Sequence, residues 1–409
     1  MKIAGIITEY NPFHSGHELH LKKTRSLTKC DAVVCVMSGN FVQRGAPALI
    51  DKWTRTEMAL ENGVDLILEL PAVYAVSSAE FFASGAISIL NSLEVIDSVS
   101  FGSECGDIEL LKDISSILHQ ESPEFRILLK KHLDLGFPIQ VSRSKALIET
   151  IHKMNLPYDD EYILKQLGSS NNILGIEYIK AISRSKSRMT PFTFRREGAD
   201  YNNTELQTDF SSASSIRKYL KNKGEINSLK MHLPEKTFRI LEDLSRKNYD
   251  FAFEEKMFKY LKYKILTEGR NLSKLPDVSE GLDNKIIKEI ENSAGFDELI
   301  LNCKSKRYTY TRLSRILTQF FAGFENYNLK ELRNTPPEYI RILGLNHNGA
   351  EILKLIKKNS SLHLINKIKN TSDPMLSMDI HATKAYSLIC SNVNSKDDFL
   401  RSPVIKFSR

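Results

Sequence analysis

The sequence predicts an α/β protein in which a mostly parallel sheet comes first and a mostly α-helical region follows. Between residues 1 and 103, short and almost wholly apolar runs alternate with helical patterns, as expected of strands buried on both faces of a parallel sheet. Each run ends in a polar loop or in one that contains glycine or proline. After Gly224 the alternation stops, and helical periodicity continues to the end of the chain. We therefore expect one domain at 1–225, with a helical insertion at about 107–150, and a second domain at 226–409.

Local signals set the elements of the first domain. Asn11-Pro12 ends the first strand, and Asn62-Gly63 closes the second helix. Because crossovers between parallel strands are right-handed, the carboxyl ends of the strands meet at one edge, where ligands bind. The predicted strands are residues 2–8, 32–37, 65–71, 98–101 and 191–196. Outside the insertion, one predicted helix starts at His17 and another starts at 171–175. Three more are predicted at 54–61, 80–90 and 218–223.

The composition is that of a soluble globular protein. The 57 Lys and Arg residues against 50 Asp and Glu give a formal net charge of +7, which permits an anionic partner without requiring one. No run approaches the roughly 18 apolar residues of a membrane span, and the N-terminal apolar run ends at Glu9, too early for a signal peptide. The five cysteines are scattered without a C-x-x-C pair, which argues against a disulfide framework and a structural zinc site. We expect a cytoplasmic protein that does not bind membranes.

His14 and His17 stand three residues apart where the first strand passes into the first helix. Gly16 between them lets the backbone approach a ligand closely, and the free N–H groups of the first helical turn attract phosphate. An isolated H-x-x-H pair is more often a pair of ordinary loop histidines. The buried strand before the pair, the helix after it and the glycine favour a nucleotide site. The arrangement resembles the H-x-G-H signature of the nucleotidyltransferase superfamily, in which both histidines contact nucleotide phosphates, and it implies a Rossmann-like nucleotidyltransferase domain.

A serine cluster, residues 211–217, lies directly before the helix at 218–223. Such a cluster is primarily an N-cap signal, and capping alone is one of two interpretations of the serines. In the nucleotidyltransferase superfamily, a similar segment ending in Ile-Arg supplies hydroxyls, N–H groups and a cation to the departing phosphates. The arginine favours the second interpretation. The residues expected to hold pyrophosphate are Ser212, Ser214 and Arg217.

The segment 303–315 carries five basic residues and two tyrosines but no acidic residue. Lysine and arginine neutralise phosphates, and aromatic rings offer stacking faces to unpaired bases. A solvated helix face is the alternative, since most charge runs are solvated. The interleaved tyrosines favour a surface that binds nucleic acid. The residues predicted to form it are Lys304, Lys306, Arg307, Tyr308, Tyr310, Arg312 and Arg315.

Taken together, these motifs resemble one family, the bacterial tRNA(Met) cytidine acetate ligases. The match extends over most of the chain and both predicted domains. The segments that carry it are 9–17, 36–41, 43–45, 101–104, 171–175 and 306–309.

The resemblance implies a two-step reaction. Acetate attacks the α-phosphorus of ATP to form acetyl-adenylate and pyrophosphate, and the acetyl group then passes to the wobble cytidine of elongator tRNA(Met). His14 and His17 are the expected catalytic residues, ATP is the expected cofactor with Mg²⁺ as its counter-ion, and no residue is assigned as a ligand of that ion. Arg196 is preferred to Arg195 because of its spacing from Asn171. The resemblance places the ATP site on Ile7, Thr8, Glu9, Tyr10, Asn11, Pro12, Phe13, His14, Ser15, Gly16, His17, Glu18, Leu19, His20, Gly102, Asn171 and Arg196.

Two other functions remain open from the residues alone. An adenylyltransferase that joins AMP to a small phosphorylated acceptor would carry the same H-x-G-H motif but would leave the basic helical half without a purpose. A non-catalytic RNA-binding protein on a nucleotide-binding fold would bind tRNA without releasing pyrophosphate. The complete set of His14, Gly16, His17 and Arg217 disfavours the second of these.

Overall fold

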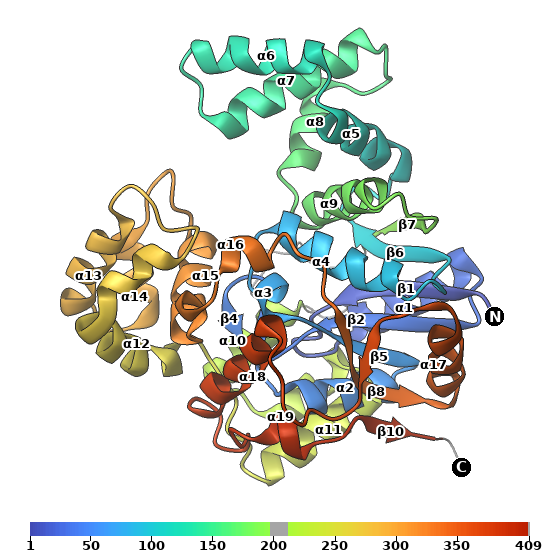
Figure 1. The fold of residues 1–409 in the computed structure, drawn as a ribbon, viewed down its shortest axis with the longest axis vertical. Helices are drawn as coiled ribbons and strands as arrows, with labels where there is room; N and C mark the ends of the chain where they lie inside the picture. Colours follow the sequence, from blue (N-terminus) through green and yellow to red (C-terminus); the bar gives the residue numbers. More distant parts are fainter. Residues whose placement is uncertain (197–211, 408–409) are drawn as a thin grey trace.

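A computed structural model describes residues 1–196 and 212–407 and is organised around one sheet of eight strands (Figure 1). The strand order is β10-β8-β5-β2-β1-β6-β7, with β9 paired to β8 at the side. All neighbouring strands are parallel except β5 and β8, which are antiparallel. The strands are β1 (Ile3–Thr8), β2 (Ala32–Ser38), β5 (Leu66–Leu70), β6 (Ser98–Ser103), β7 (Thr190–Arg195), β8 (Tyr339–Asn346), β9 (His363–Ile365) and β10 (Val404–Lys406).

The α/β architecture predicted for the first part of the chain is confirmed. All five predicted strands form, each within two residues of its expected bounds. Their apolar composition has the expected cause, because every residue of β2 and β5 is buried between helices on the two faces of the sheet. The helices of this part are α1 (Ser15–Thr28), α2 (Lys52–Glu61), α3 (Ala72–Ala75), α4 (Ala79–Ser92), α9 (Ser170–Arg184) and α10 (Ala213–Lys221).

A helical insertion separates β6 from α9, as expected. It projects away from the sheet at the top of Figure 1, where its second and third helices lie side by side as an antiparallel pair. It continues to Leu167, further than the expected end near 150. Its helices are α5 (Ile108–Gln120), α6 (Pro123–Asp134), α7 (Ile139–Lys153) and α8 (Asp160–Leu167).

A second group of helices follows α10. Three short 3₁₀ helices connect them: η1 (Ile226–His232), η2 (Gly269–Lys274) and η3 (Phe324–Asn326). The α-helices of this group are α11 (Glu235–Arg246), α12 (Glu255–Glu268), α13 (Leu282–Asn292), α14 (Phe296–Cys303), α15 (Tyr310–Phe321) and α16 (Leu329–Leu332). Helices α12 to α16 lie beside the edge of the sheet where β1 and β2 end, whereas α11 packs against α2 (Figure 1).

The prediction of a mostly helical region in the second part of the chain is confirmed. The end of the chain nevertheless returns to the sheet through β8, β9 and β10, so the expectation that helical periodicity continues to the end is wrong there. The sequence pattern does not predict β8, because Arg341 and Gly344 interrupt its apolar run. Both residues have a structural reason: the guanidinium of Arg341 makes buried ion pairs, and a Cβ at Gly344 would lie 2.4 Å from Cγ2 of Thr56 on α2. The helices of this last segment are α17 (His347–Asn359), α18 (Pro374–Ser387) and α19 (Asp397–Leu400).

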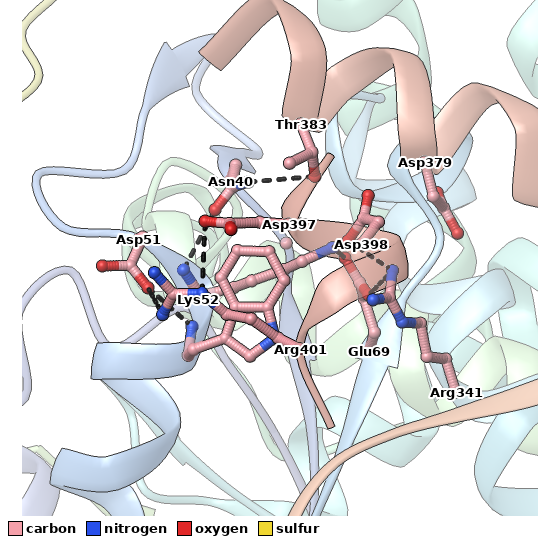
Figure 2. Close-up of polar contacts among 12 residues, drawn as sticks. Asn40, Asp51, Lys52, Glu69, Arg341, Asp379, Thr383, Asp397, Asp398 and Arg401 are labelled. Atoms are coloured by element: carbon pink, nitrogen blue, oxygen red, sulfur yellow. Dashed lines mark hydrogen bonds and ion pairs between the residues drawn. The ribbon is translucent and has the colours of Figure 1, made fainter. Parts of the chain in front are cut away.

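Buried charges join this last segment to the sheet (Figure 2). Nζ of Lys52 lies 2.6 Å from Glu69 and 2.8 Å from Asp398, and Arg341 lies 3.1 Å and 2.8 Å from the same two carboxylates. Each of the four residues is at most 5% exposed. Asn40 reaches the same region by donating to the hydroxyl of Thr383 at 3.2 Å. The loop after β2 is therefore tied to the C-terminal helices.

Candidate active site

The ends of β1 and β6 open onto a cavity of about 300 Å³. Its walls also include the starts of α1, α9 and α10 and a small hairpin made by β3 (Phe41–Val42) and β4 (Ala46–Pro47). This is the edge at which parallel sheets bind ligands, because loops that leave neighbouring strands converge there. The start of α15, from the second group of helices, completes the lining.

Most residues predicted to bind ATP line this cavity. They are Ile7, Thr8, Glu9, Tyr10, Asn11, His14, His17, His20, Gly102, Asn171 and Arg196. The three residues predicted to hold pyrophosphate, Ser212, Ser214 and Arg217, line it too, whereas Ser211 lies outside the described residues. The predicted ATP-binding residues that do not line the cavity are Pro12, Phe13, Ser15, Gly16, Glu18 and Leu19.

The two histidines of the H-x-G-H motif cap α1 reciprocally. Nδ1 of His14 accepts the N–H of Gly16 at 3.0 Å, and Nδ1 of His17 accepts the N–H of His14 at 3.2 Å. A neutral imidazole that accepts at Nδ1 carries its proton on Nε2. The ring centroids are 3.9 Å apart, and neither Nε2 has a hydrogen-bond partner among residues 1–196 and 212–407. Two N–H donors are thus available to a ligand in the cavity.

Gly16 is part of the cap. Its backbone is helical, but the His14 ring folds over it, and a Cβ at this position would lie 2.7 Å from Cε1 of His14. The close approach that the structure shows is to the ring of His14. A close approach of the Gly16 backbone to a ligand stays a prediction.

The histidines are neutral near pH 7. Burial, followed by the charges of Arg196 and Arg217, lowers the pKa of His14 to about 3. Burial and the neighbouring His14 hold the pKa of His17 well below its ordinary value, and burial lowers the pKa of His20 to about 4. The unfolded chain binds protons at these residues below about pH 6.5, whereas the folded chain does not, so they reduce stability as the pH falls below that value. The positive charge of the site comes from its arginines.

Arg217 ties the serine cluster to the loop before the histidines. It donates to the carbonyl of Asn11 at 2.7 Å and to the hydroxyl of Ser214 at 3.1 Å. The hydroxyl of Ser212 accepts the N–H of Ser215 at 3.1 Å and caps α10. Helix capping and phosphate binding, the two interpretations of the serine cluster, both have a physical basis here. The capped N-terminus of α10 and the guanidinium of Arg217 border the same cavity.

On the other side of the cavity, β6 and α9 are held together around Glu104. Its carboxylate accepts the N–H of Asn171 at 3.2 Å, the side-chain amide of the same residue at 2.8 Å and the N–H of Asn172 at 2.9 Å. Arg196 lines the cavity and passes directly over Gly102, where a Cβ would lie 2.9 Å from its Cγ. Arg195 packs instead against Gly106. The geometry thus favours Arg196 over its neighbour.

A residue that sequence reasoning missed, Arg55 of α2, fixes the ends of two central strands. It is fully buried and donates to the carbonyls of Glu9 at 2.6 Å, Ser38 at 3.1 Å and Ile50 at 2.9 Å, and also to that of Gly39. These carbonyls lie at the end of β2, in the loops that directly follow β1 and β2, and in the segment between β4 and α2. An arginine within an amphipathic helix is usually solvent-exposed, so the sequence does not predict that Arg55 is buried and donates to these carbonyls.

The basic segment 303–315 divides into buried and exposed members. Tyr308 is buried, donates its hydroxyl to the carbonyl of Ser279 at 2.6 Å, and carries the guanidinium of Arg312 over its ring at 4.7 Å. Arg312 also donates to the carbonyl of Asp277 at 2.8 Å, and burial lowers the pKa of Arg315. The exposed members are Lys304, Lys306, Arg307 and Tyr310. Of the seven predicted tRNA contacts, Tyr310 alone lines the cavity, and the tRNA-binding role of the segment stays a prediction.

Further residues line the cavity that were not predicted as site residues. The β3–β4 hairpin contributes several, and the N–H of Gln43 donates to the Glu9 carboxylate at 2.8 Å. The Gln-Arg-Gly run in this hairpin carried part of the family resemblance, so a signal for it existed. Glu254, Thr311 and Ser314 reach the site from the second group of helices, and no local pattern predicts that contact.

Two features are absent from residues 1–196 and 212–407. No helix there is long and apolar enough to cross a membrane. Nor does this part of the chain contain a group of three or more His, Cys, Asp or Glu side chains that could hold a metal ion.

The fold and the site define a nucleotidyltransferase of the H-x-G-H type, and a family model described as HIGH Nucleotidyl Transferase matches residues 1–399. More narrowly, the chain is 52% identical over 404 residues to the tRNA(Met) cytidine acetate ligase of Clostridium novyi (strain NT), covering 99% of each chain. It is 49% identical over 405 residues to the enzyme of the same name from Clostridium botulinum (strain Okra / Type B1), covering 99% of this chain and 98% of that one. The chain therefore belongs to the tRNA(Met) cytidine acetate ligase family, and the resemblance stated from the sequence is confirmed.

Solved structures agree with this assignment. The structure superimposes on the crystal structure of Thermotoga maritima TmcAL (apo, form I) with a TM-score of 0.92 and 33% identity over the whole of both chains. It also superimposes on Thermotoga maritima TmcAL bound with alpha-thio ATP (Form II), with a TM-score of 0.89 and 32% identity, again over both whole chains.

Proposed function

We propose that this chain activates acetate with ATP and transfers the acetyl group to the wobble cytidine of elongator tRNA(Met). In the first step a carboxylate oxygen of acetate attacks the α-phosphorus, and pyrophosphate leaves. In the second, the exocyclic amine of the cytidine attacks the acetyl carbonyl, and AMP leaves. Support comes from the names of relatives that are about half identical over their full length, and from a cavity suited to an anionic nucleotide.

In the first step the protein's task is to position two anions and to stabilise the charge that develops on phosphorus. His14 and His17 donate from Nε2 to the α-phosphate, and because their donors are fixed by the reciprocal cap, little reorganisation is needed in the transition state. Arg217, Ser214 and the N-terminus of α10 receive the pyrophosphate. The two neutral imidazoles suit this role beside the arginines. Their Nε2–H groups donate to phosphate oxygens without adding further positive charge to a buried site.

Magnesium is expected to enter with ATP and to be held by the phosphate oxygens. The described residues offer it no cluster of ligands, and none of the roles above depends on it. In this proposal the exposed basic residues of segment 303–315 contact the phosphates of the tRNA.

The reciprocal histidine cap is the observation that carries the proposal, and His17→Ala tests it. Removing one fixed donor from a charge-stabilising site typically costs about 10²–10³-fold in rate. We expect acetate-dependent ATP–pyrophosphate exchange to fall by about that factor, with tRNA binding close to that of the unmodified chain. His119→Ala, on the exposed side of α5, is the matched control and leaves exchange unchanged. Undiminished exchange in His17→Ala would remove the residue from the chemistry.

A further inference from the structure

One part of the cavity is not explained by nucleotide binding. Glu254, which directly precedes α12, and Tyr310 and Thr311, the first residues of α15, line the same cavity as the two histidines. They reach it because α15 packs on the β3–β4 hairpin, where the hydroxyls of Ser314 and Thr318 donate to the carbonyl of Gly45 at 2.6 and 2.7 Å. The helical region thus builds one wall of the active site.

Glu254 has the wrong charge for a nucleotide-phosphate contact. The other charged side chains of the cavity are Arg44, Arg196, Arg217 and Glu9, whose carboxylate accepts the N–H of Gln43. The carboxylate of Glu254, by contrast, makes no hydrogen bond or ion pair within the part of the chain that the structure describes. A carboxylate repels phosphates and accepts N–H donors. Among nucleic-acid groups, the exocyclic amine of cytosine is the donor that Glu and Asp recognise. The position therefore suits the acceptor amine rather than the phosphates of ATP.

Tyr310 is held in a fixed orientation beside this carboxylate. Its hydroxyl donates to Asp297, which also lies 3.6 Å from Nζ of Lys221. Burial and the charge of Asp297 raise the pKa of the Tyr310 hydroxyl above its ordinary value, so the ring stays neutral. An aromatic ring anchored at its hydroxyl end loses little freedom when a base stacks on it.

We propose that Glu254, Tyr310 and Thr311 form the acceptor subsite, in which the target cytosine is bound and its amine is deprotonated. This inference rests on the proposed function and deepens it. The carboxylate of Glu254 accepts a hydrogen bond from the exocyclic amine, which orients the nitrogen toward the acetyl carbonyl of acetyl-adenylate. A C–N bond forms as the C–O bond to AMP breaks, AMP leaves with the electron pair, and the amine proton passes to Glu254. Tyr310 stacks on the base, and Thr311 borders it with a hydroxyl.

Separating the two half-reactions tests the subsite. In Glu254→Gln we expect acetate-dependent ATP–pyrophosphate exchange to stay within about two-fold of the unmodified chain. Acetyl transfer to tRNA in a single turnover falls by about 10²–10⁴-fold, the usual contribution of a positioned acid or base. Glu254→Asp retains a carboxylate and recovers part of the transfer rate. Glu268→Gln, an exposed residue at the other end of α12, is the matched control and changes neither rate.

A second variant addresses base binding. Tyr310→Ala raises the KM for tRNA by about ten-fold or more, as expected for the loss of one base-stacking contact, and leaves exchange unchanged. Two results for Glu254→Gln would overturn the subsite. A loss of exchange would assign Glu254 to the binding of the nucleotide or its metal. Acetyl transfer at the normal rate would show that Glu254 does not act on the acceptor amine. A lack of acetate-dependent exchange in the unmodified chain would instead overturn the proposed function.

Discussion

His14, Gly16 and His17 act as one unit at the scale of single residues. Each histidine uses Nδ1 to satisfy a backbone N–H at the start of α1, which leaves Nε2–H for the ligand. The glycine is required because the first ring occupies the space that a Cβ would fill. The motif therefore fixes the tautomer of both imidazoles as well as their position, and the spacing of the three residues follows from the geometry of a helix cap.

Gly16→Ala tests this unit. The new Cβ would lie 2.7 Å from Cε1 of His14, so the ring must move and the Nδ1 cap is lost. We expect a loss of about 1 kcal/mol in the free energy of unfolding, the typical value of an N-cap, and a rise of at least about ten-fold in the Kd for ATP. Gly168→Ala is the control, because a Cβ there meets its nearest neighbour at an ordinary 3.6 Å. Equal ATP affinities in the two variants would show that the cap does not set the donor geometry.

At the scale of elements, the loops after β1 and β2 are held in place by α2. From one helical position Arg55 donates to four carbonyls, which lie at the end of β2, in the loops after β1 and β2 and just before α2. The hairpin that follows β2 packs on α15. Burial lowers the pKa of Arg55, but nearby Asp51 and Glu9 favour its charged form. Contacts between these elements therefore hold the site in place before a ligand binds.

Arg55→Met measures this preorganisation. It keeps the apolar stem but leaves buried carbonyls without donors, each of which costs about 1–3 kcal/mol. We expect the free energy of unfolding in urea to fall by about 3 kcal/mol or more, and exchange to weaken even where the chain remains folded. Arg55→Lys retains a charge and a single donor group. We expect its stability and its exchange rate to lie between those of the unmodified chain and those of Arg55→Met. A stable Arg55→Met with normal exchange would contradict the role.

At the scale of the whole molecule, the chain closes on itself through buried charges. Residues 339–406 return to the sheet, and Lys52 and Arg341 face Glu69 and Asp398 away from water (Figure 2). Burial raises the pKa of Asp398, but the charges of Lys52 and Arg341 outweigh this effect and lower that pKa to about 2. Two positive and two negative groups balance, and removing any one leaves an unpaired buried charge.

Lys52→Met tests that balance. We expect the free energy of unfolding to fall by about 3–5 kcal/mol, because Glu69 and Asp398 then share a single cation. The double variant Lys52→Met, Glu69→Gln restores neutrality, and we expect it to be less destabilised than the sum of its single changes. Denaturant unfolding of the four chains gives the coupling. Additive losses would mean that the four groups do not interact as a network.

The sequence allowed the first part of the fold to be predicted because each strand of that part is a continuous buried run. It also allowed the histidines, the serine cluster and Arg196 to be placed at one sheet edge, since local motifs mark them. It did not predict β8, because Arg341 inside the run is satisfied only by partners distant in the chain. Nor did it predict that Glu254 and Thr311 line the cavity, since their position depends on how α12 and α15 pack against the hairpin.

A crystal structure of this chain with a non-hydrolysable ATP analogue tests the central claim most directly. We predict the α-phosphate within hydrogen-bond distance of Nε2 of both His14 and His17, and the β- and γ-phosphates beside Arg217 and the start of α10. An analogue bound away from both imidazoles would contradict the account.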